Sequence, residues 1–368
     1  MSAMPKRPAA MTEAEDRGRL PVALLTGFLG SGKTTLLNAL LRDPCLADTA
    51  VAINEFGETP LDQDLVAHDD DKTLVMANGC LCCNLAGDFE EAVMRIFSRL
   101  QLDMSPIFSR LIVEPSGLAD PAPIAQAVLR NPVLSRFLRL ESIIATVDAV
   151  FGRRHLAEWS ESRKQVAMAD KIVLTKADLV RPRDLAALEA EVANINPHAP
   201  RIYGDTARSK ASLVFPARFF DAEAETPSIA TWLADFDSHP MERRLLPDGP
   251  QAGHDHGATS ISIVCGTPLV WREFEDWLRR IRIDWSNQLL RVKGILNLAG
   301  CALPVVVQGV HHVLHPAVEL DRWPSDDRRS RLVFITEGAA SREILVRWEE
   351  SASRLMTPQF QAHAGPTA

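Results

Sequence analysis

Residues 22–35 read Val-Ala-Leu-Leu-Thr-Gly-Phe-Leu-Gly-Ser-Gly-Lys-Thr-Thr. The four leading apolar residues predict a buried strand, and the leucines that follow are spaced like one face of a helix. Between them lies the Gly-x-x-x-x-Gly-Lys-Thr pattern of a phosphate-binding loop, in which backbone N–H groups and a helix N-terminus attract phosphate oxygens. We therefore predict that a nucleotide binds to Gly27, Gly30, Ser31, Gly32, Lys33, Thr34 and Thr35.

A second loop supplies a carboxylate for binding Mg²⁺ at the phosphates of the same nucleotide. Glu114-Pro115-Ser116-Gly117 follows an apolar strand at 111–113. A carboxylate in this position holds Mg²⁺ or its bound water, and the glycine that follows can approach the γ-phosphate. Lys33 can reach the outer phosphates and the Thr34 hydroxyl can ligate Mg²⁺. We predict Lys33 and Glu114 as catalytic residues and Thr34 and Glu114 as Mg²⁺ ligands; the alternative for Glu114 is a solvated turn.

The base of the nucleotide is predicted from Thr175-Lys176-Ala177-Asp178, which follows another apolar strand. GTPases recognise guanine with an Asn-Lys-x-Asp loop, whose aspartate accepts hydrogen bonds from the guanine N1–H and exocyclic amine. Adenine lacks this pair of donors, so the carboxylate discriminates between the two bases. Thr175 replaces the usual asparagine, while Lys176 and Asp178 are kept. The motif predicts GTP, and the alternative is a surface Lys–Asp pair.

Three crowded cysteines, Cys80, Cys82 and Cys83, indicate a second kind of chemistry. Thiolates are soft ligands that suit Zn²⁺, Cu⁺ or Co²⁺. Their close spacing is cramped for a closed tetrahedral site, so we expect an open, exchangeable one, with Glu58 as an outside ligand. Disulfide exchange is the competing interpretation. The single cysteines are predicted to be buried thiols: Cys45, Cys265 and Cys301.

Composition limits the class of protein and its partners. The chain has 368 residues, which predicts two domains, and a net charge of −8 without a Lys/Arg run. This charge argues against nucleic acid or an anionic membrane as a partner. No apolar run approaches a membrane span, and the first twenty residues lack the apolar core of a signal peptide. We expect a cytoplasmic protein and leave homo-oligomerisation open.

The pattern of elements predicts the fold class. Apolar strands alternate with helical segments, which indicates an α/β domain with a mostly parallel sheet. A new periodic region from 259 indicates a smaller C-terminal α+β domain. The predicted organisation is a disordered tail (1–19), a P-loop GTPase domain (20–215), a linker (216–258), the α+β domain (259–350) and a disordered tail (351–368).

These motifs occur in one order that resembles the CobW-type metallochaperone GTPases (CobW/HypB/UreG-related), a branch of the P-loop GTPases. The resemblance extends over roughly residues 20–350, and its most specific part is the Cys-x-Cys-Cys loop at 80–83. It implies GTP hydrolysis coupled to delivery of a transition metal, often zinc or cobalt, to a client metalloprotein. The family often has a long histidine-rich linker, whereas this linker has only His254 and His256, either solvated or an accessory metal-collecting pair.

The sequence therefore predicts a metal-binding GTPase with GTP, Mg²⁺ and Zn²⁺ or Co²⁺ as its ligands. Two rivals remain at this point. One is a P-loop kinase of small molecules, which ATP selectivity would favour. The other is a non-enzymatic zinc-storage or zinc-sensing protein that uses GTP as a structural ligand, which an absence of multiple turnover would favour. No sequence feature marks a catalytic base, so slow intrinsic hydrolysis is expected.

Overall fold

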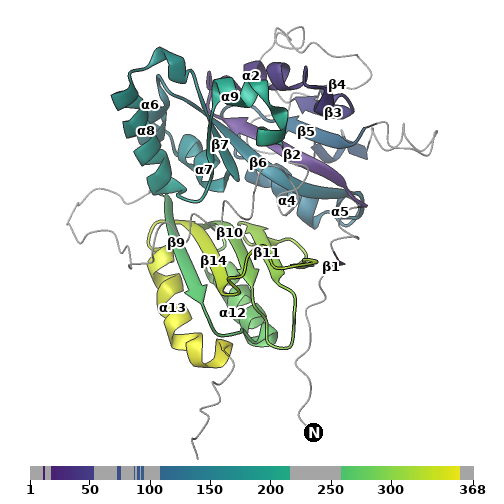
Figure 1. Cartoon of the computed structure of the whole chain (residues 1–368), viewed down its shortest axis with the longest axis vertical. Helices are drawn as coiled ribbons and strands as arrows, with labels where there is room; N and C mark the ends of the chain where they lie inside the picture. Colours follow the sequence, from purple (N-terminus) through teal and green to yellow (C-terminus); the bar gives the residue numbers. More distant parts are fainter. Residues whose placement is uncertain are drawn as a thin grey trace, which may run out of the picture.

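The computed structural model shows two domains stacked along the long axis of the molecule (Figure 1). It describes the residues 11–12, 18–53, 73–75, 87, 89–91, 93–94, 108–215 and 258–356. Within these ranges, no helix is both long and apolar enough to cross a membrane.

The sheet of the first domain is parallel throughout the described residues. Its seven strands lie in the order β4-β3-β5-β2-β6-β7-β8. The strands are β2 (Leu20–Gly27), β3 (Thr49–Ile53), β4 (Thr73–Val75), β5 (Arg110–Glu114), β6 (Leu138–Asp148), β7 (Lys171–Thr175) and β8 (Arg201–Tyr203). Because the inner strands are buried on both faces, they appear in the sequence as unbroken apolar runs. The predicted α/β fold is confirmed.

Helices cover both faces of this sheet. Alternate residues of β2 show the division: Ala23 and Leu25 join one core with α2, α9 and α10, while Val22 and Leu24 join another with α4 and α7. The helices are α2 (Lys33–Leu40), α4 (Ala122–Arg130), α5 (Leu134–Phe137), α6 (Gly152–Glu158), α7 (Ser160–Met168), α8 (Pro182–Ile195), α9 (Gly204–Ser209) and α10 (Ala211–Val214). The described part of the domain also contains the 3₁₀ turns η1 (Pro44–Leu46) and η3 (Ala177–Leu179).

The C-terminal domain has a mostly antiparallel sheet in the order β1-β13-β11-β10-β14-β9, with β12 paired to β11. The strands are β9 (Ala258–Cys265), β10 (Leu289–Leu296), β11 (Val305–Val310), β12 (Val313–Leu314), β13 (Val318–Glu319) and β14 (Ser330–Glu337). Two helices, α12 (Trp271–Asp284) and α13 (Ala340–Leu355), pack on one face. Leu332 and Phe334 of β14 point into that core, while Val333 and Ile335 enter the core shared with the first domain. Both faces of this sheet are therefore used for packing.

The chain ends contain ordered elements inside the segments predicted as tails. β1 (Met11–Thr12) pairs in parallel with β13, so residues before the first domain extend the sheet of the second. At the other end, α13 continues to Leu355. Residues 216–257 of the predicted linker (216–258) lie outside the described residues, and the domain boundaries stay predictions.

Candidate nucleotide-binding site

The phosphate-binding loop connects β2 to α2 and depends on glycine at several turns. Gly27, Gly30 and Gly32 have φ values of 145°, 70° and 84°, in the region that L side chains rarely adopt. A Cβ on Gly27 would also lie 2.2 Å from Thr146 Oγ1. No side chain of the described residues caps the N-terminus of α2. The first N–H groups of this helix are therefore available to an anion.

Lys33 begins α2 and is almost fully buried. Its Nζ donates to the carbonyl oxygens of Gly27 at 2.9 Å and Phe28 at 3.4 Å, which folds the side chain back over the loop. A cation held at the loop by its own carbonyls lies where phosphate oxygens would bind, and the catalytic role of Lys33 stays a prediction.

The two predicted Mg²⁺ ligands lie together. Thr34 Oγ1 donates a hydrogen bond of 2.7 Å to Glu114 Oε1, and Glu114 is only 4% exposed. The pair joins the start of α2 to the carboxyl end of β5. A hydroxyl and a buried carboxylate are hard oxygen donors of the kind Mg²⁺ prefers, so these residues fit that ion.

The turn that follows Glu114 packs directly on the phosphate loop. A Cβ on Gly117 would lie 2.7 Å from the backbone nitrogen of Leu29, so a larger residue would not fit here. On the other side of the loop, the buried hydroxyls of Ser31 and Thr146 share a hydrogen bond of 2.6 Å. The loop is thus fixed from two strands, β5 and β6.

The end of β7 is bonded to the same loop. Thr175 Oγ1 donates to the Ser31 carbonyl at 2.7 Å, and Lys176 Nζ donates to the Gly30 carbonyl at 2.8 Å. Lys176 also pairs with the buried carboxylate of Asp148 at 2.6 Å. Asp178 follows in η3 and is exposed. The predicted phosphate and base motifs therefore form one continuous site, with Asp178 open to solvent.

Sequence reasoning missed three residues of this site: Thr146, Asp148 and Gln165. Thr146 and Asp148 end the apolar run of β6, and a polar residue at the carboxyl end of a parallel strand is the signal that could have identified them. Gln165 lies on α7 and donates to the turn at Gly117. Nothing in its local sequence distinguishes it from a solvated helical residue.

The predicted transition-metal ligands lie outside the described residues: Glu58, Cys80, Cys82 and Cys83, as do His254 and His256. Their flanking strands are described. β3 and β4 are parallel neighbours with Ile53 opposite Val75, so the segments after both strands leave from one edge of the sheet. Ile53 also pairs with Glu114, which places that edge beside the predicted Mg²⁺ ligands. Within the described ranges, no cluster of three His, Cys, Asp or Glu side chains could hold a metal ion.

One expectation about the remaining cysteines is wrong. Cys265 is buried and Cys301 is partly buried, but Cys45 is exposed because it lies in the short 3₁₀ turn η1 after α2. The burial of the neighbouring Leu46 accounts for the apolar local sequence.

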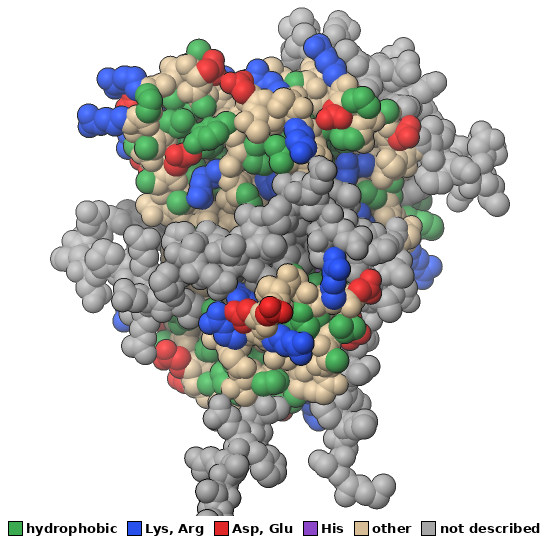
Figure 2. Space-filling view, viewed as in Figure 1, with side chains coloured by type: hydrophobic (Ala, Val, Ile, Leu, Met, Phe, Trp, Pro, Cys, Tyr) green, Lys and Arg blue, Asp and Glu red, His purple; other side chains and the backbone are tan. Residues whose placement is uncertain are grey.

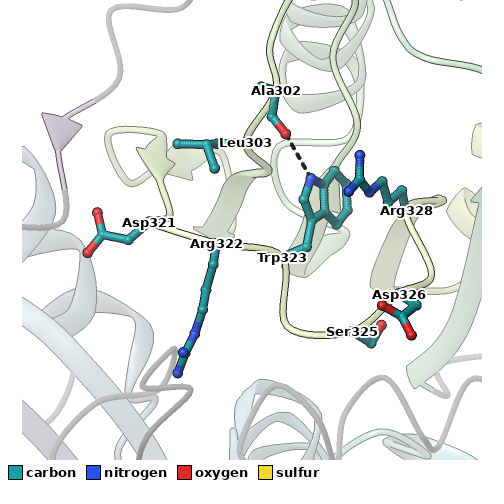
Figure 3. Close-up of a pocket in the computed structure, with 8 residues that line it drawn as sticks. All are labelled: Ala302, Leu303, Asp321, Arg322, Trp323, Ser325, Asp326 and Arg328. Atoms are coloured by element: carbon teal, nitrogen blue, oxygen red, sulfur yellow. Dashed lines mark hydrogen bonds between the residues drawn. The ribbon is translucent and has the colours of Figure 1, made fainter.

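A cavity of about 670 Å³ lies in the C-terminal domain, away from the nucleotide-binding residues. Figure 3 shows Trp323, which donates from Nε1 to the Ala302 carbonyl at 3.0 Å, and Arg328 beside its ring. None of the predicted site residues lines it. The cavity adds no group to the nucleotide site.

Two family models match the chain in the same order as the two domains. Residues 21–203 match the model described as CobW/HypB/UreG, nucleotide-binding domain, and residues 258–351 match the cobalamin synthesis protein cobW C-terminal domain. The chain belongs to the CobW family. The resemblance found in the motifs is thereby confirmed over both domains.

Named relatives and a solved structure agree with this membership. The chain is 30% identical over 318 residues to the zinc chaperone YjiA of Escherichia coli, covering 86% of this chain and 93% of that protein. It is 30% identical to zinc-regulated GTPase metalloprotein activator 1 of Saccharomyces cerevisiae, over 82% of this chain and 77% of that protein. The crystal structure of Zn(II)-bound YjiA GTPase from E. coli matches with a TM-score of 0.59 at 25% identity. The match covers 90% of this chain and 98% of that structure.

Proposed function

We propose that this CobW-family protein is a GTPase that couples GTP hydrolysis to delivery of a transition metal, zinc or cobalt, to a client metalloprotein in the cytoplasm. The observation that most supports it is the bonding of Thr175 and Lys176 to the phosphate loop, because it unites a guanine motif and a phosphate cradle in one site. Two relatives, a zinc chaperone and a zinc-regulated GTPase metalloprotein activator, support the choice of cargo.

The phosphate end of the site acts through position and charge. Lys33 and the N–H groups at the start of α2 stabilise negative charge on the outer phosphates as it shifts during phosphoryl transfer. Thr34 and Glu114 would hold Mg²⁺, which when bound neutralises phosphate charge. Gly117, which packs so closely on Leu29 that a Cβ would not fit, would offer its backbone to the γ-phosphate.

The base end of the site acts through Asp178. Its exposed carboxylate can accept both guanine donors, while the Lys176 side chain remains bonded to the phosphate loop. ATP would leave this carboxylate without its two donors, which disfavours ATP relative to GTP by a few kcal/mol.

The transition-metal end is proposed from the topology of the sheet. Residues after Ile53 and Val75 leave neighbouring parallel strands, and Ile53 lies in register with Glu114. The metal would therefore bind beside the edge of the sheet at which β5 ends in Glu114. Its ligands would be Glu58, Cys80, Cys82 and Cys83. The ordering of these segments by GTP and their release on hydrolysis would couple metal affinity to the nucleotide.

The face of the molecule in Figure 2 supports a partner other than a polyanion. Acidic and basic side chains are intermixed on the face shown in Figure 2. A nucleic-acid site would gather basic residues of one sign.

The experiment that tests this function measures phosphate release under multiple turnover with GTP and with ATP. We expect slow turnover of GTP that Lys33→Ala abolishes. ATP selectivity would favour a kinase, and GTP binding without turnover would favour a storage or sensing protein.

The metal assignment has its own matched pair of variants. Cys82→Ala should weaken zinc binding and leave GTP affinity nearly intact, whereas Cys45→Ala, which removes an exposed thiol outside the loop, should change neither. Unchanged zinc affinity in Cys82→Ala would refute the assignment of the cysteine loop.

A further inference from the structure

Gln165 is a fully buried glutamine that bonds to the turn after Glu114, which contains Gly117. It lies on α7, is 1% exposed, and donates from Nε2 to the carbonyl oxygens of Gly117 and Ala119, each at 3.1 Å. Two carbonyl acceptors require the NH₂ end of the amide at this position, so the orientation of the side chain is defined. One side chain therefore holds the turn at two points.

The backbone that Gln165 holds is in contact with the phosphate loop. Gly117 has no room for a Cβ, because Leu29 N, Cδ2 and Cα would all lie within 2.9 Å of it. A change in the Gly117 peptide therefore alters its distance to the loop and to the proposed position of the γ-phosphate. The α- and β-phosphates would bind to the loop and the start of α2. The affinity for GDP, which lacks the γ-phosphate, would therefore not depend on the position of Gly117.

The helix that carries Gln165 is a fixed support. Asn196 donates from Nδ2 to the carbonyls of Val166, Ala167 and Ala169 at 2.9, 3.2 and 2.9 Å, which satisfies the C-terminal end of α7. Asp170, two residues after the end of α7, is bonded to Arg291 of the C-terminal domain at 2.7 Å. The position of Gln165 is thus set independently of the turn.

We infer that Gln165 is a positioning residue that sets the Gly117 turn for the γ-phosphate and thereby lets the protein distinguish GTP from GDP. Its buried Oε1 has no hydrogen-bond partner among the described residues. A buried acceptor left unsatisfied is costly, so the amide keeps its two bonds to the turn in spite of that cost. The inference rests on the proposed GTPase function.

The test compares the affinities for a non-hydrolysable GTP analogue and for GDP in Gln165→Met and Gln165→Asn. Methionine keeps the length and removes the donor, and asparagine keeps the amide but withdraws it. We expect the affinity for the GTP analogue to fall about tenfold, with GDP affinity within about twofold of the wild-type value. GDP binding also reports that each variant is folded.

Asn196→Ala is the matched control, because it removes a buried amide that bonds to the C-terminal end of α7 without touching the turn. It should lower the unfolding midpoint and leave the ratio of GTP to GDP affinity unchanged. A wild-type ratio in either folded Gln165 variant, or an equal loss of both nucleotides, would overturn the inference. If the wild-type protein binds neither nucleotide, the proposed function fails instead.

Discussion

A buried ion cluster joins the two domains, and its disruption should destabilise the whole molecule. Asp170 lies between α7 and β7 of the first domain, and its Oδ1 is 2.7 Å from Arg291 and in contact with Lys293, both on β10. Its Oδ2 accepts from the Ile143 N–H at 2.8 Å. Burial alone would raise the pKa of Asp170, but the two cations and these hydrogen bonds hold it down to about 2. Asp170→Asn removes the negative charge while keeping the size.

The magnitude follows from what the substitution leaves behind. The side chains of Arg291 and Lys293 are only 3% and 11% exposed, so both positive charges would stay buried without their carboxylate. Breaking a buried ion pair in this way typically costs about 3–5 kcal/mol, because desolvation of the remaining charge is no longer offset. We expect a loss of this size in the free energy of unfolding.

The assay is urea denaturation followed by tryptophan fluorescence and circular dichroism. The control is Asp184→Asn, which breaks a solvent-exposed pair with Arg181 and should leave the urea midpoint nearly unchanged. In the double variant Asp170→Asn/Lys293→Met, removal of one stranded cation should restore part of the loss. A cost below about 1 kcal/mol for Asp170→Asn would refute the view that this cluster holds the domains together.

Three further predictions concern single residues. Asp178→Ala should lower GTP affinity about 100-fold and leave ATP affinity unchanged, measured by nucleotide titration; equal losses would contradict guanine recognition. Burial lowers the pKa of His315 to about 3, so the unfolded chain takes up a proton below about pH 6.5 before the folded chain does. His315 should therefore contribute a loss of stability of about 1.4 kcal/mol per pH unit below 6.5, and His315→Gln should reduce the slope by this amount in urea melts at pH 5 and 7.5. Gly27→Ala should abolish nucleotide binding through collision with Thr146, whereas Gly30→Ala, whose Cβ meets no described atom within 4 Å, should only weaken it.

Much of the site was predictable because local chemistry specifies it. Gly27, Gly30 and Gly32 have the positive φ values that their spacing implies, and Thr34 and Glu114 meet although 80 positions separate them, because both follow neighbouring strands of one parallel sheet. The role of Thr175 was less clear from sequence. Its hydroxyl donates to the Ser31 carbonyl, so it ties the base motif to the phosphate loop.

Contacts between domains were not predictable in the same way. Asp170 precedes an ordinary apolar strand, and its partner Arg291 lies 121 positions later on a different sheet. The pairing of β1 with β13 likewise joins residues from opposite ends of the chain. Such contacts depend on how the two folded domains pack, which no local periodicity encodes. Cys45 shows the converse, because Leu46 beside it is buried while its own side chain is exposed.

The coupling of metal affinity to the nucleotide is tested most directly by titrating the purified protein with Zn²⁺ in the presence of a non-hydrolysable GTP analogue and, separately, of GDP. If metal binding responds to the γ-phosphate, the metal must have different affinities for the GTP-bound and the GDP-bound protein. By linkage, the metal must then change the ratio of the GTP and GDP affinities by the same factor. We predict a difference of at least fivefold in the Zn²⁺ dissociation constant. Equal dissociation constants with GTP analogue and GDP would contradict a metal-delivery mechanism driven by GTP.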